Sequence, residues 1–295
     1  MTVIEQLVIG ASMGAVLLLI ALGLTFTFGQ MGVINMAHGE FIMAGAYTTF
    51  LLQGVLGTLA VPAALPVAFL VAGSLGLILE RLLIRRFYGR PLDTLLLTWG
   101  VSLILQQVAR DIFGAPNVNV AAPGWLTGGV SLGSLDLPYN RIFILALALG
   151  CVVASWFYLS RMPHGRRMRA VMQNRRLAAV SGVVTERVDQ LTFFLGSGLA
   201  GVAGVALTLI GPIGPTLGTT YIVDAFLVVV VGGLGQLRGT VIAAFALGML
   251  GSFAESWTRS SSAASLAKVV VFVAIIAFLQ FRPQGLVVLR SRALT

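Results

Sequence analysis

Long apolar segments separated by short polar stretches run through the whole chain. A helix that crosses the hydrocarbon core of a bilayer needs about 20 mostly apolar residues. Nine segments follow this pattern: 6–28, 31–53, 63–84, 92–112, 141–160, 191–210, 221–235, 239–256 and 266–281. The glycines at 232–239 could instead form a re-entrant turn, so eight or nine crossings are expected. The pattern predicts an all-α, polytopic membrane protein whose residues 1–295 form a single transmembrane domain.

Composition supports this class. The chain is 58% hydrophobic and only 10% charged, whereas a soluble domain carries about 25% charged residues. The N-terminus lacks the basic segment of a secretory signal, so residues 6–28 are expected to be the first membrane helix. The single cysteine, Cys151, cannot form an internal disulfide.

The basic residues are unevenly distributed. Residues 85–90 hold three arginines, 161–190 hold seven and the tail after Phe281 holds three. With Arg81 and Arg238 these make 15 of the 19 basic residues, which leaves Arg110, Arg141, Arg259 and Lys268 for the other side. Because cytoplasmic loops are enriched in Lys and Arg, we expect the N-terminus outside, the C-terminus inside, 161–190 in the cytoplasm and 113–140 in the periplasm. No basic face with interleaved aromatics suggests nucleic-acid binding.

Two polar, glycine-rich stretches interrupt the apolar pattern, "GVINMAHGEFIMAGAY" (32–47) and "GPIGPTLGTTYIVD" (211–224). Each follows a long apolar segment and precedes another, which suggests a weak internal repeat with broken or re-entrant helices. Paired broken helices often mark a transport pathway, and intramembrane polar groups usually face a bundle interior or an aqueous cavity. The candidate pathway residues are therefore Asn35, His38, Glu40, Thr98, Gln106, Gln107, Tyr221 and Asp224.

The chemistry of these residues does not indicate an enzyme. His38 and Glu40 lie about 200° apart around a helix, so they do not form a metal-binding pair on one face. Glu40 is expected to bond backbone N–H groups where the helix breaks near Gly39, to line the pathway, or to contact the cytoplasmic segment. Asp224 could either stabilise a helix N-terminus or line the pathway, and only one of Gln106 and Gln107 can face inward. We expect no catalytic residues and no metal ligands.

The only lysine in the chain, Lys268, is not preceded by a phosphate-binding G-x-x-x-x-G-K-[ST] motif. The chain is therefore not expected to hydrolyse ATP by a P-loop mechanism.

Residues 161–190 form the longest basic gap. The pattern predicts a short basic helix that ends at Gly182, followed by a helix capped by Thr185. Composition alone also fits a loop that touches anionic lipid. Small and apolar residues among the arginines favour a surface on which a cytoplasmic partner docks.

This segment resembles the cytoplasmic coupling loop of ABC-importer permeases of the branched-chain amino acid permease family. The matching positions are Gly165-Arg166, Arg169-Ala170 and Ala178-x-x-x-Gly182. That family often has an acidic pair where this chain has Gln173-Asn174-Arg175-Arg176, a departure that is similar to its urea-type branch. The stretches "GVINMAHGEF" (32–41), "LDTLLLTWGVSLILQQ" (92–107), "FGAPNVNVAAPGWLTGG" (113–129) and "YIVDAFLVVVVGGLGQLRGT" (221–240) also resemble the urea-type first permease.

The resemblance implies a permease subunit of an ATP-driven importer in the bacterial inner membrane, which carries urea or short amides, or alternatively branched-chain amino acids. It implies a homologous second permease, a periplasmic binding protein, and two cytoplasmic ATPase subunits that bind ATP, with no cofactor on this chain. The ATPases would dock through Gly165, Arg166, Arg169, Ala170, Asn174, Ala178 and Gly182. A secondary transporter with Glu40 and Asp224 as a proton relay, or a stand-alone channel, would need no such docking segment.

Overall fold

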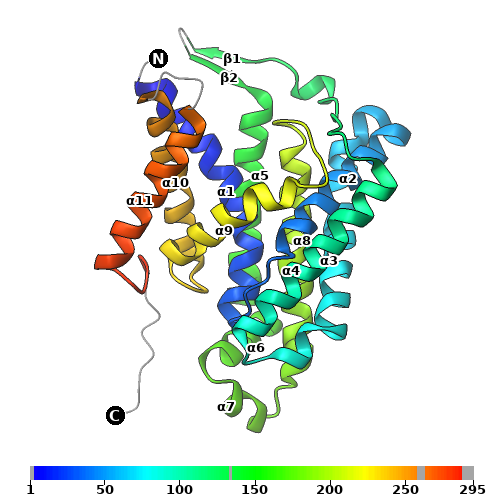
Figure 1. The fold of residues 1–295 in the computed structure, drawn as a ribbon, viewed down its shortest axis with the longest axis vertical. Coiled ribbons are helices and arrows are strands. Elements are labelled where there is room, and N and C mark those ends of the chain that lie inside the picture. Colours follow the sequence, from blue (N-terminus) through cyan, green and yellow to red (C-terminus); the bar gives the residue numbers. More distant parts are fainter. Residues whose placement is uncertain (1–2, 133–134, 258–262, 288–295) are drawn as a thin grey trace.

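The structure is a computed structural model that describes residues 3–132, 135–257 and 263–287, and these form one helical bundle (Figure 1). The long helices are α1 (Val3–Met31), α2 (His38–Leu56), α3 (Ala60–Leu82), α4 (Pro91–Phe113), α5 (Tyr139–Arg161), α8 (Thr185–Leu207), α9 (Leu217–Gly232), α10 (Leu237–Trp257) and α11 (Ala263–Phe281). Shorter elements are α6 (Pro163–Gln173), α7 (Arg175–Val180), the 3₁₀ turns η1 (Gly57–Leu59), η2 (Ile84–Phe87) and η3 (Gly124–Leu126), and the hairpin β1 (Gly129–Leu132) with β2 (Leu135–Pro138).

Each apolar segment predicted from the sequence contains most of a helix, although some predicted bounds extend beyond the helix ends. Within the described residues, 6 stretches are long and apolar enough to cross a membrane, and one of them, His38–Leu82, contains both α2 and α3. Two more apolar helices, Leu217–Gly232 and Lys268–Phe281, are shorter. The prediction of an all-α, polytopic membrane protein is confirmed.

The two ends of the bundle differ in charge. The start of α1 and the β1–β2 hairpin lie at one end, whereas α6 and α7 lie at the opposite end (Figure 1). The arginines at 85–90 lie at the α6–α7 end, where Arg85 pairs with Glu186 at the start of α8. Which of the two ends faces the cytoplasm stays a prediction from the distribution of the arginines. Arg259, Arg290 and Arg292 lie outside the described residues.

Helices α2 and α9 both begin inside the bundle. The His38 ring Nε2 lies 3.3 Å from the carbonyl oxygen of Ile20, a residue 11 positions before the end of α1, or about 16 Å back along that helix. Residues 32–37 therefore turn back into the bundle before α2 starts. Helix α9 starts at the same depth, because a Cβ on Gly39 would lie 2.6 Å from the Gly218 carbonyl oxygen.

The helices around these breaks form an inverted repeat. Helices α1, α2 and α3 correspond to α8, α9 and α10, because α3 packs along α8 as α10 packs along α1. Gly23 of α1 and Gly196 of α8 each face the other's carbonyl oxygen where the helices cross. Helix α1 runs toward the α6–α7 end and α8 runs away from it (Figure 1). The internal repeat suggested by the sequence is thus present in the fold.

The two long gaps contain more structure than the sequence pattern suggested. The gap at 113–140 contains a hairpin formed by residues 129–132 and 135–138, in which Gly129 lies opposite Pro138. Residues 161–190 form two helices instead of one, because Asn174 adopts an extended conformation between α6 and α7. Gly182 has φ +84° directly after α7, as predicted.

The predicted start of helix α8 at Thr185 is correct to within one residue, and Glu186 lies in the first turn as expected. This helix begins at Thr185, six residues before the predicted apolar segment, and its N-cap is Val184 rather than Thr185. The predicted membrane segment 191–210 leaves out the first six residues of α8, which include polar residues outside the apolar pattern. Asp189, for example, is fully buried against Arg175.

Candidate functional site

The break before α2 places polar groups in the centre of the bundle. Asn35 and His38 are 0% exposed and Glu40 is 1% exposed. The His38 ring lies edge-on to Phe41, with its Nε2 beside the Ile20 carbonyl. A fully buried polar group at this depth needs partners from the protein or from a ligand.

Helix α4 supplies many of these partners. Thr94, Thr98, Ser102 and Gln106 recur every four residues, so they lie on one face of α4, and all four are buried. Ser102 Oγ and Gln106 Nε2 donate hydrogen bonds to Glu40 Oε1 over 2.8 and 3.0 Å. Thr98 Oγ1 accepts a 3.0 Å bond from the Met36 backbone N–H. We call these four residues the α4 polar row; it attaches α4 to the broken segment.

The opposite face of α4 is apolar and exposed. It carries Leu92, Leu96, Trp99, Leu103, Ile104 and Ile112. Such a helix fits a bilayer or a partner on its outer face and a hydrogen-bonded core on its inner face. The carboxyl of Glu40 bonds to α4, and the prediction that it bonds backbone N–H groups at the break is wrong.

Several buried polar atoms near the break have no hydrogen-bond partner among the described residues. They are both side-chain atoms of Asn35, Nδ1 of His38 and Oε2 of Glu40. Buried polar atoms in native proteins are usually paired with protein, water or ligand. These atoms make the segment the strongest candidate in the described residues for contact with a polar solute.

The remaining pathway candidates lie elsewhere. Gln107 is exposed and donates to Asp111 over 2.8 Å, so only its neighbour Gln106 faces inward, as expected. Tyr221 and Asp224 are partly exposed on α9, where Asp224 interacts electrostatically with the exposed Lys268 of α11. Within the described residues no hydrogen bond connects Tyr221 or Asp224 to the Glu40 group. The structure therefore brings together Asn35, His38, Glu40, Thr98 and Gln106, and places Gln107, Tyr221 and Asp224 apart.

The α6–α7 segment, residues 161–184, protrudes at the other end of the fold (Figure 1). The inner face of α6 is formed by Gly165, Met168 and Val171. With Ala178 of α7, this face packs on Phe26 and Val188. Gly165 fits closely against the backbone of Tyr158 and Leu159, so it allows the sharp corner between α5 and α6. The segment is thus held against α1, α5 and α8 as a packed unit.

The outer surface of the segment is basic and apolar. Arg166 and Arg169 are exposed, and Ala170 is half-buried. Leu177 and Val180 of α7 are 63% and 83% exposed, and Val184 projects beside them. Exposed apolar groups outside the bilayer commonly mark a protein contact. Asn174, Ala178 and Gly182 shape α7, and Asn174 Oδ1 accepts the Leu177 backbone N–H over 3.0 Å as its N-cap.

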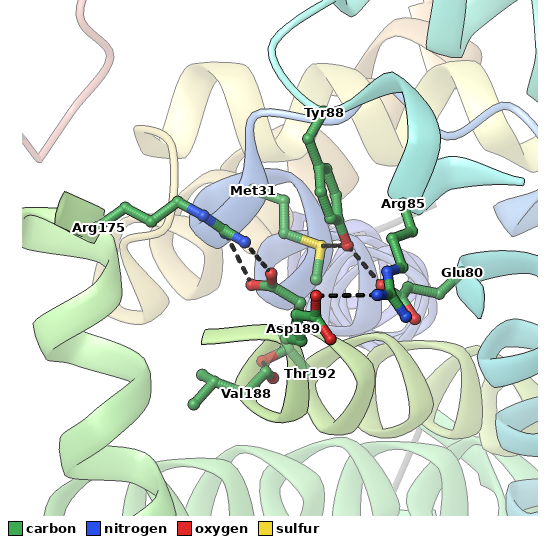
Figure 2. A network of polar contacts seen from close by, with 9 residues as sticks. Met31, Glu80, Arg85, Tyr88, Arg175, Val188, Asp189 and Thr192 are labelled. Carbon is green, nitrogen blue, oxygen red and sulfur yellow. Dashed lines mark hydrogen bonds and ion pairs between the residues drawn. The ribbon is translucent and has the colours of Figure 1, made fainter. Parts of the chain in front are cut away.

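A charged cluster connects this segment to the membrane helices (Figure 2). Arg175 of α7 forms a two-pronged ion pair with the buried Asp189 of α8; the bond from Nη1 to Oδ1 is 3.1 Å long. The Arg175 guanidinium also lies 5.2 Å from the centroid of the Tyr88 ring. Tyr88 in turn donates to Glu80 of α3 over 2.8 Å. We call Arg175, Asp189, Tyr88 and Glu80 the Arg175 cluster.

Electrostatics keep Arg175 charged and Tyr88 neutral in the Arg175 cluster. The side-chain hydrogen bonds with Asp189 raise the pKa of Arg175 above its usual value. Burial, and then the charge of Asp189, raise the pKa of the Tyr88 hydroxyl, so Tyr88 remains a neutral hydrogen-bond donor. The sequence offered little signal for this cluster, because its members are far apart along the chain.

Helices that begin inside the bundle, an inverted repeat and a protruding basic segment define a multi-pass membrane transport protein. The family described as "branched-chain amino acid transport system / permease component" matches residues 6–279. The chain belongs to this family, which consists of transport permeases rather than enzymes, and it is a multi-pass protein of the bacterial inner membrane.

Individual relatives match almost end to end. The chain is 30% identical to the high-affinity branched-chain amino acid transport system permease protein BraD of Pseudomonas aeruginosa, over 96% of this chain and 95% of the relative. It is also 30% identical to the corresponding LivH protein of Escherichia coli strain K12, over 96% and 94%. The LivM permease protein of the same organism is 28% identical over 80% of this chain and 61% of its own length. A chain of PsaBC from Streptococcus pneumoniae in complex with Fab has 12% identity and a TM-score of 0.46, over 98% and 93% of the two chains.

Proposed function

We propose that this chain is a permease subunit of an ATP-driven ABC importer that carries branched-chain amino acids across the inner membrane. The observation that carries the proposal is its near-complete alignment with permease proteins of branched-chain amino acid transport systems. These relatives support the amino-acid alternative better than the urea-type expectation.

The residues that suggested urea have other roles in the fold. In the "QNRR" stretch, Asn174 caps α7 and Arg175 pairs with Asp189. In the "TWG…QQ" stretch, Gln106 bonds Glu40 and Gln107 bonds Asp111. These contacts give the residues roles within the protein that do not depend on a urea substrate.

The partners follow from the same proposal. LivH and LivM of Escherichia coli are two permease proteins of one organism and both are similar to this chain, which supports a core made of two homologous permeases. The exposed basic and apolar surface of α6 and α7 supports docking of cytoplasmic ATPase subunits. A periplasmic binding protein would deliver substrate at the end that carries the β1–β2 hairpin. Neither a secondary transporter nor a channel accounts for the α6–α7 surface.

Transport in proteoliposomes tests this function. The chain, its second permease and the ATPases are reconstituted with the binding protein, and uptake of labelled leucine is compared with uptake of labelled urea. We expect ATP-dependent leucine uptake that unlabelled urea does not inhibit. Uptake of urea alone would restore the urea-type assignment, and uptake by this chain alone without ATP would refute the importer.

A second experiment tests the docking surface. Arg169→Glu is expected to abolish co-purification of the ATPases without altering the thermal unfolding midpoint.

A further inference from the structure

The buried carboxylate of Asp189 fixes α7 to α8. Asp189 is fully buried, whereas the side chain of Arg175 is 42% exposed. Removing one partner of a buried ion pair is strongly destabilising, because the charge that stays buried loses its compensating charge. Arg175 therefore cannot move away from Asp189 independently, and a displacement of α7 must carry the start of α8 with it.

Tyr88 extends this connection to two more helices. Its ring lies against the Arg175 guanidinium, and its hydroxyl donates to Glu80 of α3. Tyr88 also stands between η2 and Pro91, the first residue of α4. Helix α4 carries the polar row that holds Glu40 in the centre of the bundle. A contiguous path of contacts thus runs from α7 to the break before α2.

The other ion pairs near this cluster have no buried partner. Arg85 and Glu186 form a 2.9 Å pair, but both side chains are about half exposed. Arg90 and Asp93 are 3.8 Å apart on the surface of a single turn. Exposed pairs of this kind contribute little and are easily replaced by water. Among the ion pairs of the described residues, the pair between Arg175 and Asp189 alone combines a fully buried partner with contacts to separate helices.

We propose that Arg175 and Asp189 are positioning residues that transmit displacement of the α6–α7 segment to α8 and, through Tyr88, to α3 and α4. The proposal rests on the function proposed above, in which ATPases dock on this segment. Breaking the pair would leave ATPase docking intact and would uncouple ATP hydrolysis from substrate movement.

The test separates coupling from stability by removing either one charge or both. Arg175→Gln removes the cation that pairs with the buried carboxylate of Asp189, so the thermal midpoint of this variant is expected to fall. The double variant Arg175→Gln/Asp189→Asn also removes the buried negative charge, so its midpoint is expected to return toward that of the wild type. Arg175→Lys keeps the charge but lacks the planar fork, and an intermediate effect is expected. Arg90→Gln, which removes one charge from an exposed pair, is the matched control.

Each variant is reconstituted in the complete complex, and three quantities are measured: ATPase co-purification, ATP hydrolysis, and leucine uptake per ATP hydrolysed. The double variant is expected to bind the ATPases normally, while its uptake per ATP falls by about 2- to 30-fold. Wild-type uptake per ATP in the double variant would overturn the proposal, and so would loss of ATPase binding, which would make the pair part of the docking surface. A wild-type complex that shows no ATP-dependent leucine uptake would refute the proposed function instead.

Discussion

The attachment of α4 to the broken segment can be tested by removing its donors in steps. Ser102 and Gln106 both donate to Glu40 Oε1, over 2.8 and 3.0 Å. Ser102→Ala leaves Gln106 in place, and an interhelical hydrogen bond in a membrane protein contributes about 0.6–1.7 kcal/mol. Ser102→Ala is therefore expected to lower the free energy of unfolding by about that amount.

The double variant Ser102→Ala/Gln106→Leu should cost more than the two bonds. It leaves the Glu40 carboxyl, which is 1% exposed, without a donor from α4. An unsatisfied buried polar group costs about a further 1–3 kcal/mol, so a total loss of about 2–6 kcal/mol is expected. Adding Glu40→Leu removes the unsatisfied group and should recover about 1–3 kcal/mol.

Unfolding by SDS in mixed micelles, followed by circular dichroism, measures these differences. Gln107→Leu is the matched control, because Gln107 lies on the exposed face of the same helix and bonds only within α4. Two results would refute the reasoning. One is a double variant within about 0.5 kcal/mol of the wild type, the usual range for surface substitutions. The other is a triple variant that is less stable than the double variant.

Three other substitutions test separate parts of the fold. Gly218→Ala places a Cβ against the backbone of Gly39, so overpacking should lower stability by about 1–3 kcal/mol. Gly54→Ala is the control, because a Cβ there meets open space and the thermal midpoint should stay unchanged. Equal effects of the two substitutions would contradict the close contact between Gly218 and Gly39. Val180→Asp should reduce co-purification of the ATPases. The thermal unfolding midpoint should stay unchanged, because Val180 is 83% exposed. Normal co-purification would show that α7 is not part of the docking surface. Asn174→Ala removes the N-cap of α7 and should reduce the local stability of this helix by about 1 kcal/mol. Amide hydrogen exchange across 175–180 should therefore be faster in Asn174→Ala, but not in Asn174→Ser. Unchanged exchange in Asn174→Ala would exclude the cap.

The membrane helices could be predicted from the sequence because the bilayer imposes a length and a composition on each of them. The boundaries were less predictable wherever polar residues are sheltered inside the protein. Helix α2 begins at His38 instead of residue 31, because residues 32–37 turn back into the bundle. Helix α8 begins six residues before the predicted membrane segment 191–210, although the expected helix start at Thr185 was correct to within one residue. A hydropathy pattern alone assigns such polar residues to loops.

The candidate site was partly predictable. Asn35, His38 and Glu40 stand out in apolar sequence, and the structure buries all three together. Ser102 was overlooked, although the spacing of Thr98, Ser102 and Gln106 predicts one face of a helix. The Arg175 cluster depends on contacts between distant parts of the chain, and no local spacing encodes those.

The inward polar row of α4 has a consequence for how the protein is made. Helix α4 has the lowest hydropathy of the candidate membrane spans among the described residues. A helix with polar groups on one face enters the hydrocarbon core less readily than a uniformly apolar one. Helix α2 precedes α4 in the chain and carries Glu40, the acceptor for Ser102 and Gln106. Stable insertion of α4 during synthesis is therefore expected to depend on α2 being already in the membrane, which makes the order of the helices part of the assembly pathway.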